Sequence, residues 1–184
     1  MGDMAPNVIH TIGHSTRSVD ELIALLREAS VDLLVDVRSF PRSRRNPQFN
    51  IDTLPAVLSP HGITYHHIAA LGGRRNAASD TSPNTAWREP AFRNYADYAL
   101  TPAFRSGLDD LLAEARQHHP AIMCAEAMWW QCHRRIITDY LLARGVEVRH
   151  IMSHDHIAPA SLTPGAQPQA DATVLYPPEQ QTLI

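Results

Sequence analysis

The sequence contains no lysine, and all 16 of its basic residues are arginine. This absence excludes catalysis through a lysine Schiff base and also the Walker-type phosphate loop, which requires a lysine. Cysteine is scarce as well, because the 184-residue chain has only two. In a reducing compartment two cysteines are expected to remain thiols. No apolar stretch approaches the length of a membrane span.

The composition is typical of a single globular domain. Hydrophobic residues make up 44% of the chain and charged residues 19%. A chain of this length buries roughly 70% of its unfolded surface, so no cofactor is needed to hold the fold. Residues 1–7 lack the basic start and the apolar core of a signal peptide, and we therefore expect a cytoplasmic protein. The net charge of -3 argues against coating of nucleic acid by the whole surface.

Short apolar runs alternate with segments whose apolar residues recur at helical spacing. Ser18 and Glu21 have the spacing of a helix-capping box, and Thr101 before a proline marks another helix start. Strands are predicted over residues 8–12, 33–37, 63–68, 146–151 and a run that begins at 121, and helices over residues 18–29, 51–58, 92–98, 102–118 and 136–145. This alternation predicts a three-layer, doubly wound, mostly parallel α/β sheet of about five strands.

We expect one domain over residues 1–152 and a flexible tail over residues 153–184. The tail is dense in proline, alanine and small polar residues, a composition typical of a linker, and it ends in a C-terminal peptide. Residues 76–90 are rich in small polar residues and are expected to form a long exposed loop.

The most informative stretch is A-I-M-C-A-E-A-M-W-W-Q-C-H-R-R, residues 121–135. It begins as a buried strand and leads into a helix, and ligands bind beyond the carboxyl ends of parallel strands. Both cysteines fall in this connection together with an acid, a histidine and two arginines. The candidate centre therefore consists of Cys124, Glu126, Cys132, His133 and Arg134.

Polar residues also follow the other predicted strands. The candidate ligand-binding residues are His14, Ser15, Asp36, Arg38, Arg42, Arg74, Trp130 and Arg134. Loops after neighbouring parallel strands meet at one edge of the sheet, so several guanidinium groups are expected around one cavity. Guanidinium groups match phosphate or carboxylate in a bidentate way, which predicts an anionic ligand.

Several motifs occur in the same order as in one known family. They are G-H-S-T, D-V-R-S-F-P-R-S-R-R, L-G-G-R, F-R-N-Y-A-D-Y, C-A-E and C-H-R-R. Over about residues 9–152 the chain resembles the domain-of-unknown-function 488 family. The resemblance implies an α/β domain and assigns no activity, so the chemistry has to come from the residues.

The first hypothesis is an enzyme that processes nucleic acid or nucleotides, such as a DNA-repair enzyme. In it Glu126 and His133 do acid-base work, the cysteines tune the pocket, and Trp129 or Trp130 stacks on a base. The reaction is hydrolysis of a glycosidic bond or of a phosphoester, and no cofactor is expected.

Three alternatives stay open. In one, Cys124 or Cys132 is an activated nucleophile for redox, thiol-transfer or phosphoryl chemistry, although the spacing differs from that of C-x-x-C redox proteins and of the C-x-x-x-x-x-R loop of cysteine phosphatases. In another, both cysteines and His133 bind zinc with His14 or His67. The last alternative is a nucleic-acid-binding module without catalysis.

The C-terminal peptide Q-Q-T-L-I suggests a protein partner. It is similar to the short glutamine-led peptides by which bacterial replication and repair proteins dock on the sliding clamp. Gln180, Leu183 and Ile184 are the residues that would bind, at the end of a Pro-rich linker.

Overall fold

Six strands form one sheet, and their order in space is β3-β2-β4-β1-β5-β6. The computed structural model describes residues 5–77 and 81–179. The strands are β1 (Ile9–Gly13), β2 (Leu33–Asp36), β3 (Thr64–His67), β4 (Pro120–Cys124), β5 (Val148–Ser153) and β6 (His156–Pro159). Strands β1 to β5 run parallel to their neighbours, and β6 pairs antiparallel with β5. The sheet has one strand more than the sequence predicts.

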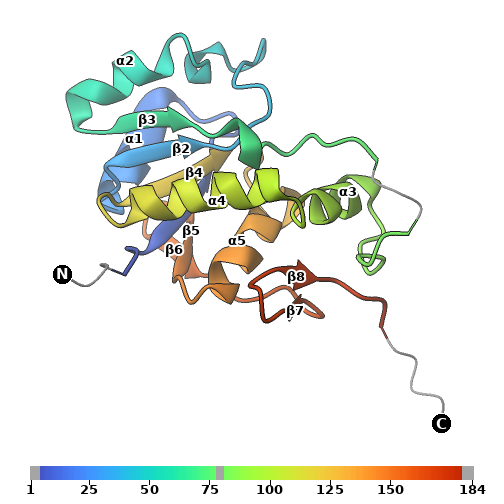
Figure 1. Ribbon diagram of the computed structural model, residues 1–184. Helices are drawn as coiled ribbons and strands as arrows, with labels where there is room; N and C mark the ends of the chain where they lie inside the picture. The colour runs from blue at the N-terminus through green and yellow to red at the C-terminus, as the bar shows by residue number, and fades with distance from the viewer. Residues whose placement is uncertain (1–4, 78–80, 180–184) are drawn as a thin grey trace.

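Helices cover both faces of this sheet. The α-helices are α1 (Val19–Glu28), α2 (Leu54–Leu58), α3 (Pro90–Tyr98), α4 (Pro102–Ala115) and α5 (Arg134–Ala143), and the 3-10 helices are η1 (Pro47–Phe49), η2 (Ser59–His61), η3 (Ala69–Leu71) and η4 (Trp129–Gln131). Figure 1 shows α4 and α5 on the near face of the sheet and α1 on the far face. Among the described residues, no helix is both long and apolar enough to cross a membrane.

The strands supply alternate side chains to two separate cores, because successive residues of a strand point to opposite faces. Leu33 and Val35 pack with α3, α4 and α5, whereas Leu34 packs with α1 and α2. In β4, Cys124 belongs to the first core and Met123 to the second. This arrangement confirms the predicted three-layer α/β fold, and it directs the Cys124 thiol toward α5.

Local sequence signals fix several helix ends. The Ser18 hydroxyl accepts a hydrogen bond of 3.1 Å from the backbone N–H of Glu21, which caps α1 as predicted. The Thr101 hydroxyl accepts one of 3.4 Å from Phe104 at the start of α4. Gly145 follows α5 with a φ of 77°, a left-handed conformation that glycine adopts without strain.

The structure differs from the prediction after residue 152. Residues 156–159 form β6. We call the following segment, residues 160–176, the C-terminal arm. It packs on α5 and contains the short strands β7 (Gln167–Pro168) and β8 (Val174–Leu175). In Figure 1 this hairpin lies below α5. Val174 and Tyr176 are buried, and the Tyr176 hydroxyl donates to Asp139 of α5 over 2.8 Å. The described domain therefore extends to Tyr176.

Candidate functional site

A cavity of about 390 Å³ opens beyond the carboxyl ends of β1, β2 and β4. These three strands are neighbours in the sheet, and Gly13 at the end of β1 lies opposite Cys124 at the end of β4. Eight of the predicted site residues line the cavity, namely His14, Arg38, Arg42, Arg74, Cys124, Glu126, Cys132 and His133. Most of the residues chosen from the sequence therefore come together in one place.

The two thiols meet at one wall of this cavity. Cys124 ends β4 and Cys132 lies just before the first turn of α5, and the two thiols are close enough to shift each other's pKa. Both residues are buried, with exposed fractions of 2% and 5%. The Cys132 sulfur also accepts from the backbone N–H of Arg134 over 3.4 Å, at the positive end of the α5 dipole.

Arg134 is buried beneath the thiols, although the sequence predicts that it contacts ligand. Its Nε donates to the Cys124 sulfur over 3.0 Å, and its Nη1 donates to the Thr11 hydroxyl over 3.1 Å. Its Nη2 donates to the Glu126 carbonyl over 2.6 Å. None of the partners of this guanidinium among the described residues is a carboxylate. A buried cation needs a counter-charge, and the sulfur pair is the neighbouring group that can carry one.

The pKa values of the two thiols move in opposite directions. Burial raises the pKa of the Cys132 thiol, but the hydrogen bond from Cys124 and the charge and N–H of Arg134 outweigh burial and lower it to about 7. Burial and the neighbouring Cys132 raise the pKa of Cys124. A pKa of about 7 makes a large fraction of Cys132 a thiolate at neutral pH, next to a protonated Cys124.

His133 is positioned to act on the same sulfur. Its Nε2 lies 2.6 Å from the Val37 carbonyl, and a carbonyl only accepts, so Nε2 carries the proton. The unprotonated Nδ1 faces the Cys132 sulfur at 3.4 Å. Burial lowers the pKa of His133, which keeps the ring neutral. Gly73 makes room for this ring, because a Cβ at that position would lie 2.5 Å from Nδ1.

A series of hydrogen-bonded polar side chains forms the cavity wall beside β1 and β2. Asp36 is fully buried and accepts hydrogen bonds from Arg38 at 2.7 and 2.9 Å. The Nη1 of Arg38 lies 3.3 Å from Nε2 of His14, whose ring stacks on Phe49. Burial lowers the pKa of His14, so a neutral ring accepts from Arg38. Asp36 does not line the cavity; it fixes the orientation of Arg38.

Two exposed arginines lie at the cavity mouth. Arg42 forms an ion pair with Asp52, and both side chains are 61% exposed. Arg74 lies over the Phe40 ring, with 5.4 Å from its guanidinium carbon to the ring centroid. An exposed ion pair of the Arg42 type is weak and is readily exchanged for an anionic ligand.

Glu126 combines a fixed backbone with an available side chain. Its backbone carbonyl accepts a hydrogen bond from Arg134. The same carbonyl packs so closely on β1 that a Cβ added at Gly13 would overlap its oxygen. Its carboxylate is exposed at the cavity, and within the described residues it forms no ion pair or hydrogen bond. This carboxylate is therefore available to a ligand.

Four predicted residues lie outside the cavity lining, namely Ser15, Asp36, Trp130 and Arg134. Trp130 is 41% exposed, packs edge-on against Trp129 and does not line the cavity, so its stacking on a ligand base stays a prediction. The sequence interpretation also missed lining residues, among them Ser39, Phe40, Phe92 and Tyr95. Each of these residues lies in one of the motifs D-V-R-S-F-P and F-R-N-Y-A-D-Y, and these motifs are the signal that could have identified them.

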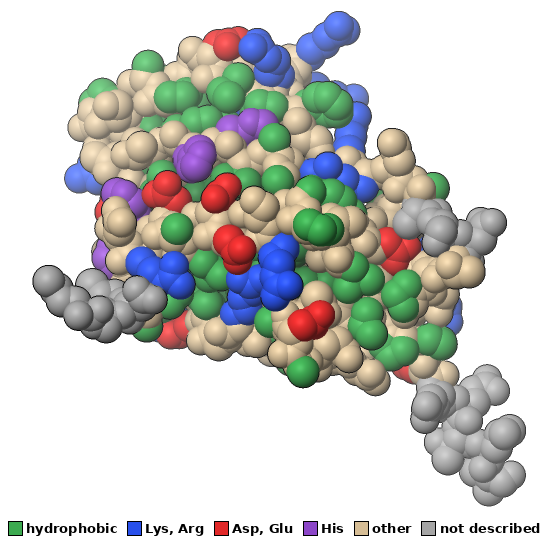
Figure 2. Space-filling view, in the orientation of Figure 1, with side chains coloured by type: hydrophobic (Ala, Val, Ile, Leu, Met, Phe, Trp, Pro, Cys, Tyr) green, Lys and Arg blue, Asp and Glu red, His purple; other side chains and the backbone are tan. Residues whose placement is uncertain are grey.

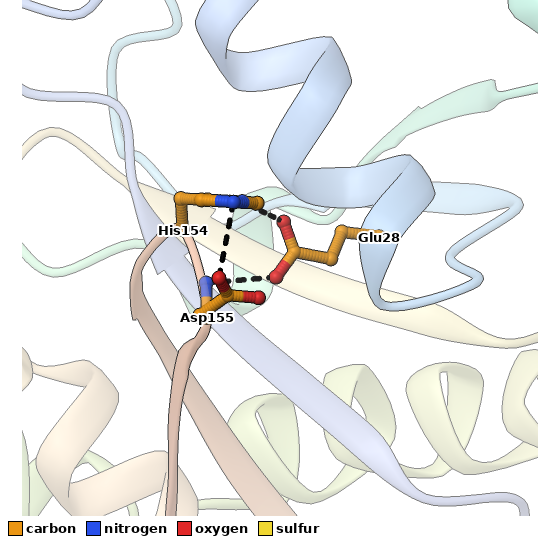
Figure 3. Close-up of side chains that lie close together, drawn as sticks. All are labelled: Glu28, His154 and Asp155. Atoms are coloured by element: carbon orange, nitrogen blue, oxygen red, sulfur yellow. Dashed lines mark hydrogen bonds and ion pairs between the residues drawn. The ribbon is translucent and has the colours of Figure 1, made fainter.

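The described residues bring three potential metal ligands close together only at Glu28, His154 and Asp155. Figure 3 shows these side chains, where the end of α1 meets the turn between β5 and β6. His154 lies 2.7 Å from the Glu28 carboxylate, and none of the three lines the cavity. The ligand atoms of Cys124, Cys132 and His133, which the zinc alternative requires, are not among the described groups that lie close enough together to hold a metal ion.

Comparison with known proteins gives one match. The family model described as a domain of unknown function, DUF488, matches residues 18–141. No curated protein and no solved structure matches the chain.

Proposed function

Because the chain belongs to the DUF488 family, a domain of unknown function, we propose its activity from the site itself: hydrolysis of a phosphoester in a nucleotide or nucleic acid, with Cys132 as the nucleophile. The observation that carries this proposal is the buried Arg134 guanidinium, which donates to the Cys124 sulfur and has no carboxylate partner in the described chain. A thiolate in the sulfur pair balances that charge, and a thiolate is the reactive form of cysteine.

The substrate class follows from the other cavity residues. Arg42 and Arg74 at the mouth match the charge and geometry of a phosphate group. Phe40, Phe92 and Tyr95 add an apolar and aromatic wall, which suits a base or another flat group attached to the phosphate. A phosphorylated ligand with an aromatic part is therefore the best match to the lining.

The proposed reaction has two steps. The Cys132 sulfur attacks phosphorus, the bond from phosphorus to the leaving oxygen breaks, and a water molecule gives a proton to that oxygen. Water then attacks the phosphocysteine, Glu126 takes a proton from the water, and the sulfur leaves as a thiolate. The backbone N–H of Arg134 donates to the sulfur in both steps.

The test is a hydrolysis screen with the full chain against para-nitrophenyl phosphate, nucleoside phosphates and short oligonucleotides. We expect Cys132→Ser to lower the rate by about 1,000-fold or more, and Cys124→Ser to lower it less. Acid quenching during turnover should trap one phosphoryl group on the peptide that contains Cys132. Absence of turnover and of this adduct for every substrate would remove the proposal.

A second candidate mechanism uses Glu126 without a thiol nucleophile, as the sequence first suggests. The observation in its favour is the unpaired Glu126 carboxylate at the cavity. In that case Glu126→Gln abolishes hydrolysis of a glycosidic bond or phosphoester, whereas Cys132→Ser retains most of the activity. The thiol mechanism predicts that Cys132→Ser abolishes activity and that Glu126→Gln only lowers it, so the Cys132→Ser variant separates the candidates.

Docking on a sliding clamp remains a separate proposal. Its residues, Gln180, Leu183 and Ile184, lie outside the described part of the chain. Tyr176 is buried in the domain, so the test peptide begins at Pro177. A peptide of residues 177–184 should bind purified clamp, and a peptide with Leu183→Ala and Ile184→Ala should not; equal binding would contradict docking.

A further inference from the structure

A basic and aromatic surface lies next to the cavity. We call it the rim patch, and it consists of Phe40, Arg42, Arg44, Arg45 and Arg74. Phe40 is 65% exposed, which is unusual for a large apolar side chain, and all four arginines are exposed. Three members of the patch, Phe40, Arg42 and Arg74, also line the cavity.

Two loops are fastened together to form this surface. The backbone N–H of Arg74 donates to the Ser39 hydroxyl over 2.8 Å. Gly72 packs directly against Ser39, because a Cβ at Gly72 would lie 2.6 Å from that hydroxyl oxygen and 2.8 Å from the Ser39 Cα. The loop after β2 and the loop after β3 therefore hold Phe40 and Arg74 side by side.

The positive charge of the rim patch is largely uncompensated. Arg44, Arg45 and Arg74 form no ion pair with any described carboxylate, and Arg42 has only its exposed pair with Asp52. Figure 2 shows basic side chains along the upper right of the molecule, over the loops that follow β2 and β3 in Figure 1. The charge is therefore local, in a chain whose net charge is -3.

We propose that the rim patch binds single-stranded nucleic acid and directs one of its phosphate groups into the cavity. Exposed aromatic rings stack on unpaired bases, and guanidinium groups without carboxylate partners contact the backbone phosphates. A cavity of about 390 Å³ holds a single small ligand, so the remainder of a strand has to lie on the rim. This inference rests on the proposed function and extends it from nucleotides to a polymer.

Binding is measured with the full-length Cys132→Ser protein, so that no turnover occurs, by fluorescence anisotropy with a labelled 12-nucleotide strand. We expect Phe40→Ala to weaken binding about 10-fold, in line with the removal of one base–aromatic stack. Arg44→Ala combined with Arg45→Ala should weaken binding at least about 10-fold and make the salt slope shallower by about 0.7 for each phosphate that the variant no longer binds. The control is Arg27→Ala combined with Arg116→Ala, two exposed arginines outside the patch.

Three results would overturn the inference. The first is an affinity of the rim-patch variants for the strand that equals the affinity of the control variant. The others are equal affinity for a duplex of the same sequence, and equal affinity for poly-glutamate of similar charge. Hydrolysis of para-nitrophenyl phosphate by the protein that retains Cys132 reports separately on the proposed function. If that activity is present and strand binding fails, only the rim inference is lost.

Discussion

Arg134 is the residue on which the site depends most, and its role could not be predicted from the sequence. The C-H-R-R motif identified it as functional, and an exposed anion clamp was the natural interpretation. In the structure its guanidinium reaches Thr11, 123 positions earlier in the chain, and the sulfur of Cys124. Contacts over such distances depend on the order of strands in the sheet, which local patterns do not encode.

Replacing Arg134 should therefore affect both stability and thiol chemistry. Arg134→Met removes the cation beside the sulfur pair and leaves the Glu126 carbonyl without its donor. We expect the Cys132 pKa to rise by about one unit or more and the free energy of unfolding to fall by about 3 kcal/mol. Urea unfolding and pH-dependent alkylation measure the two effects. Arg135→Met, at a partly exposed neighbour that stacks on Trp87, is the control and should show neither.

His150 gives a pH-dependent prediction. Burial and the Arg134 charge lower its pKa to about 4 from the ordinary value of 6.5. The unfolded chain takes up a proton below pH 6.5 that the folded chain does not, so stability is full above pH 6.5 and falls as the pH decreases to about 4. The loss attributable to this residue is about 3 kcal/mol.

Urea midpoints measured between pH 4 and 7 test this prediction. His150→Asn should make the acid-induced loss of stability smaller, whereas His61→Asn, at an exposed histidine, should leave it unchanged. Identical pH profiles for the parent and His150→Asn would contradict the assignment.

Elements whose signals are local were predicted well. The start of α1 follows from the Ser18 cap, and the end of α5 follows from Gly145, because both depend on residues within one helical turn. The close approach of β1 to the loop after β4 was not predicted. It depends on Gly13, whose neighbour in space is the Glu126 backbone.

Gly13→Ala tests this approach. The added methyl group would overlap the Glu126 carbonyl, so the loop must move away from Arg134. We expect a loss of about 3 kcal/mol in the free energy of unfolding, together with loss of the low Cys132 pKa. Gly62→Ala is the matched control, because no atom lies within 4 Å of a Cβ added at that position. Only the φ of 74° makes this substitution unfavourable, by about 1 kcal/mol. Equal losses for the two variants would show that the close packing is unimportant.

At the scale of the whole molecule, the fold class was predictable and the extent of the domain was not. Alternating apolar patterns indicated a parallel sheet covered on both faces, which the structure confirms. The C-terminal arm has the composition of a linker, and only Val174 and Tyr176 within it are buried apolar residues. Its position depends on polar contacts to Asp139 and Asn84, which leave no periodic pattern.

Two truncations test the extent of the domain. A chain ending at Thr173 loses the buried side chains of Val174 and Tyr176, and we expect its free energy of unfolding to fall by about 4 kcal/mol. A chain ending at Glu179 retains both residues and should match the full-length protein within about 0.5 kcal/mol. Thermal and urea unfolding compare the three proteins, and equal stability of the shorter truncation would refute a structural role for the arm.

The central claim is that Cys132 carries a thiolate at neutral pH in a cavity lined by arginine. The most direct measurement is the rate of iodoacetamide alkylation of the native full-length chain between pH 5 and 10, with Cys132 and Cys124 peptides quantified separately by mass spectrometry. The account predicts a half-maximal rate for Cys132 near pH 7 and slow alkylation of Cys124 throughout. A Cys132 rate that rises only around pH 8.5, as in an ordinary thiol, would contradict it.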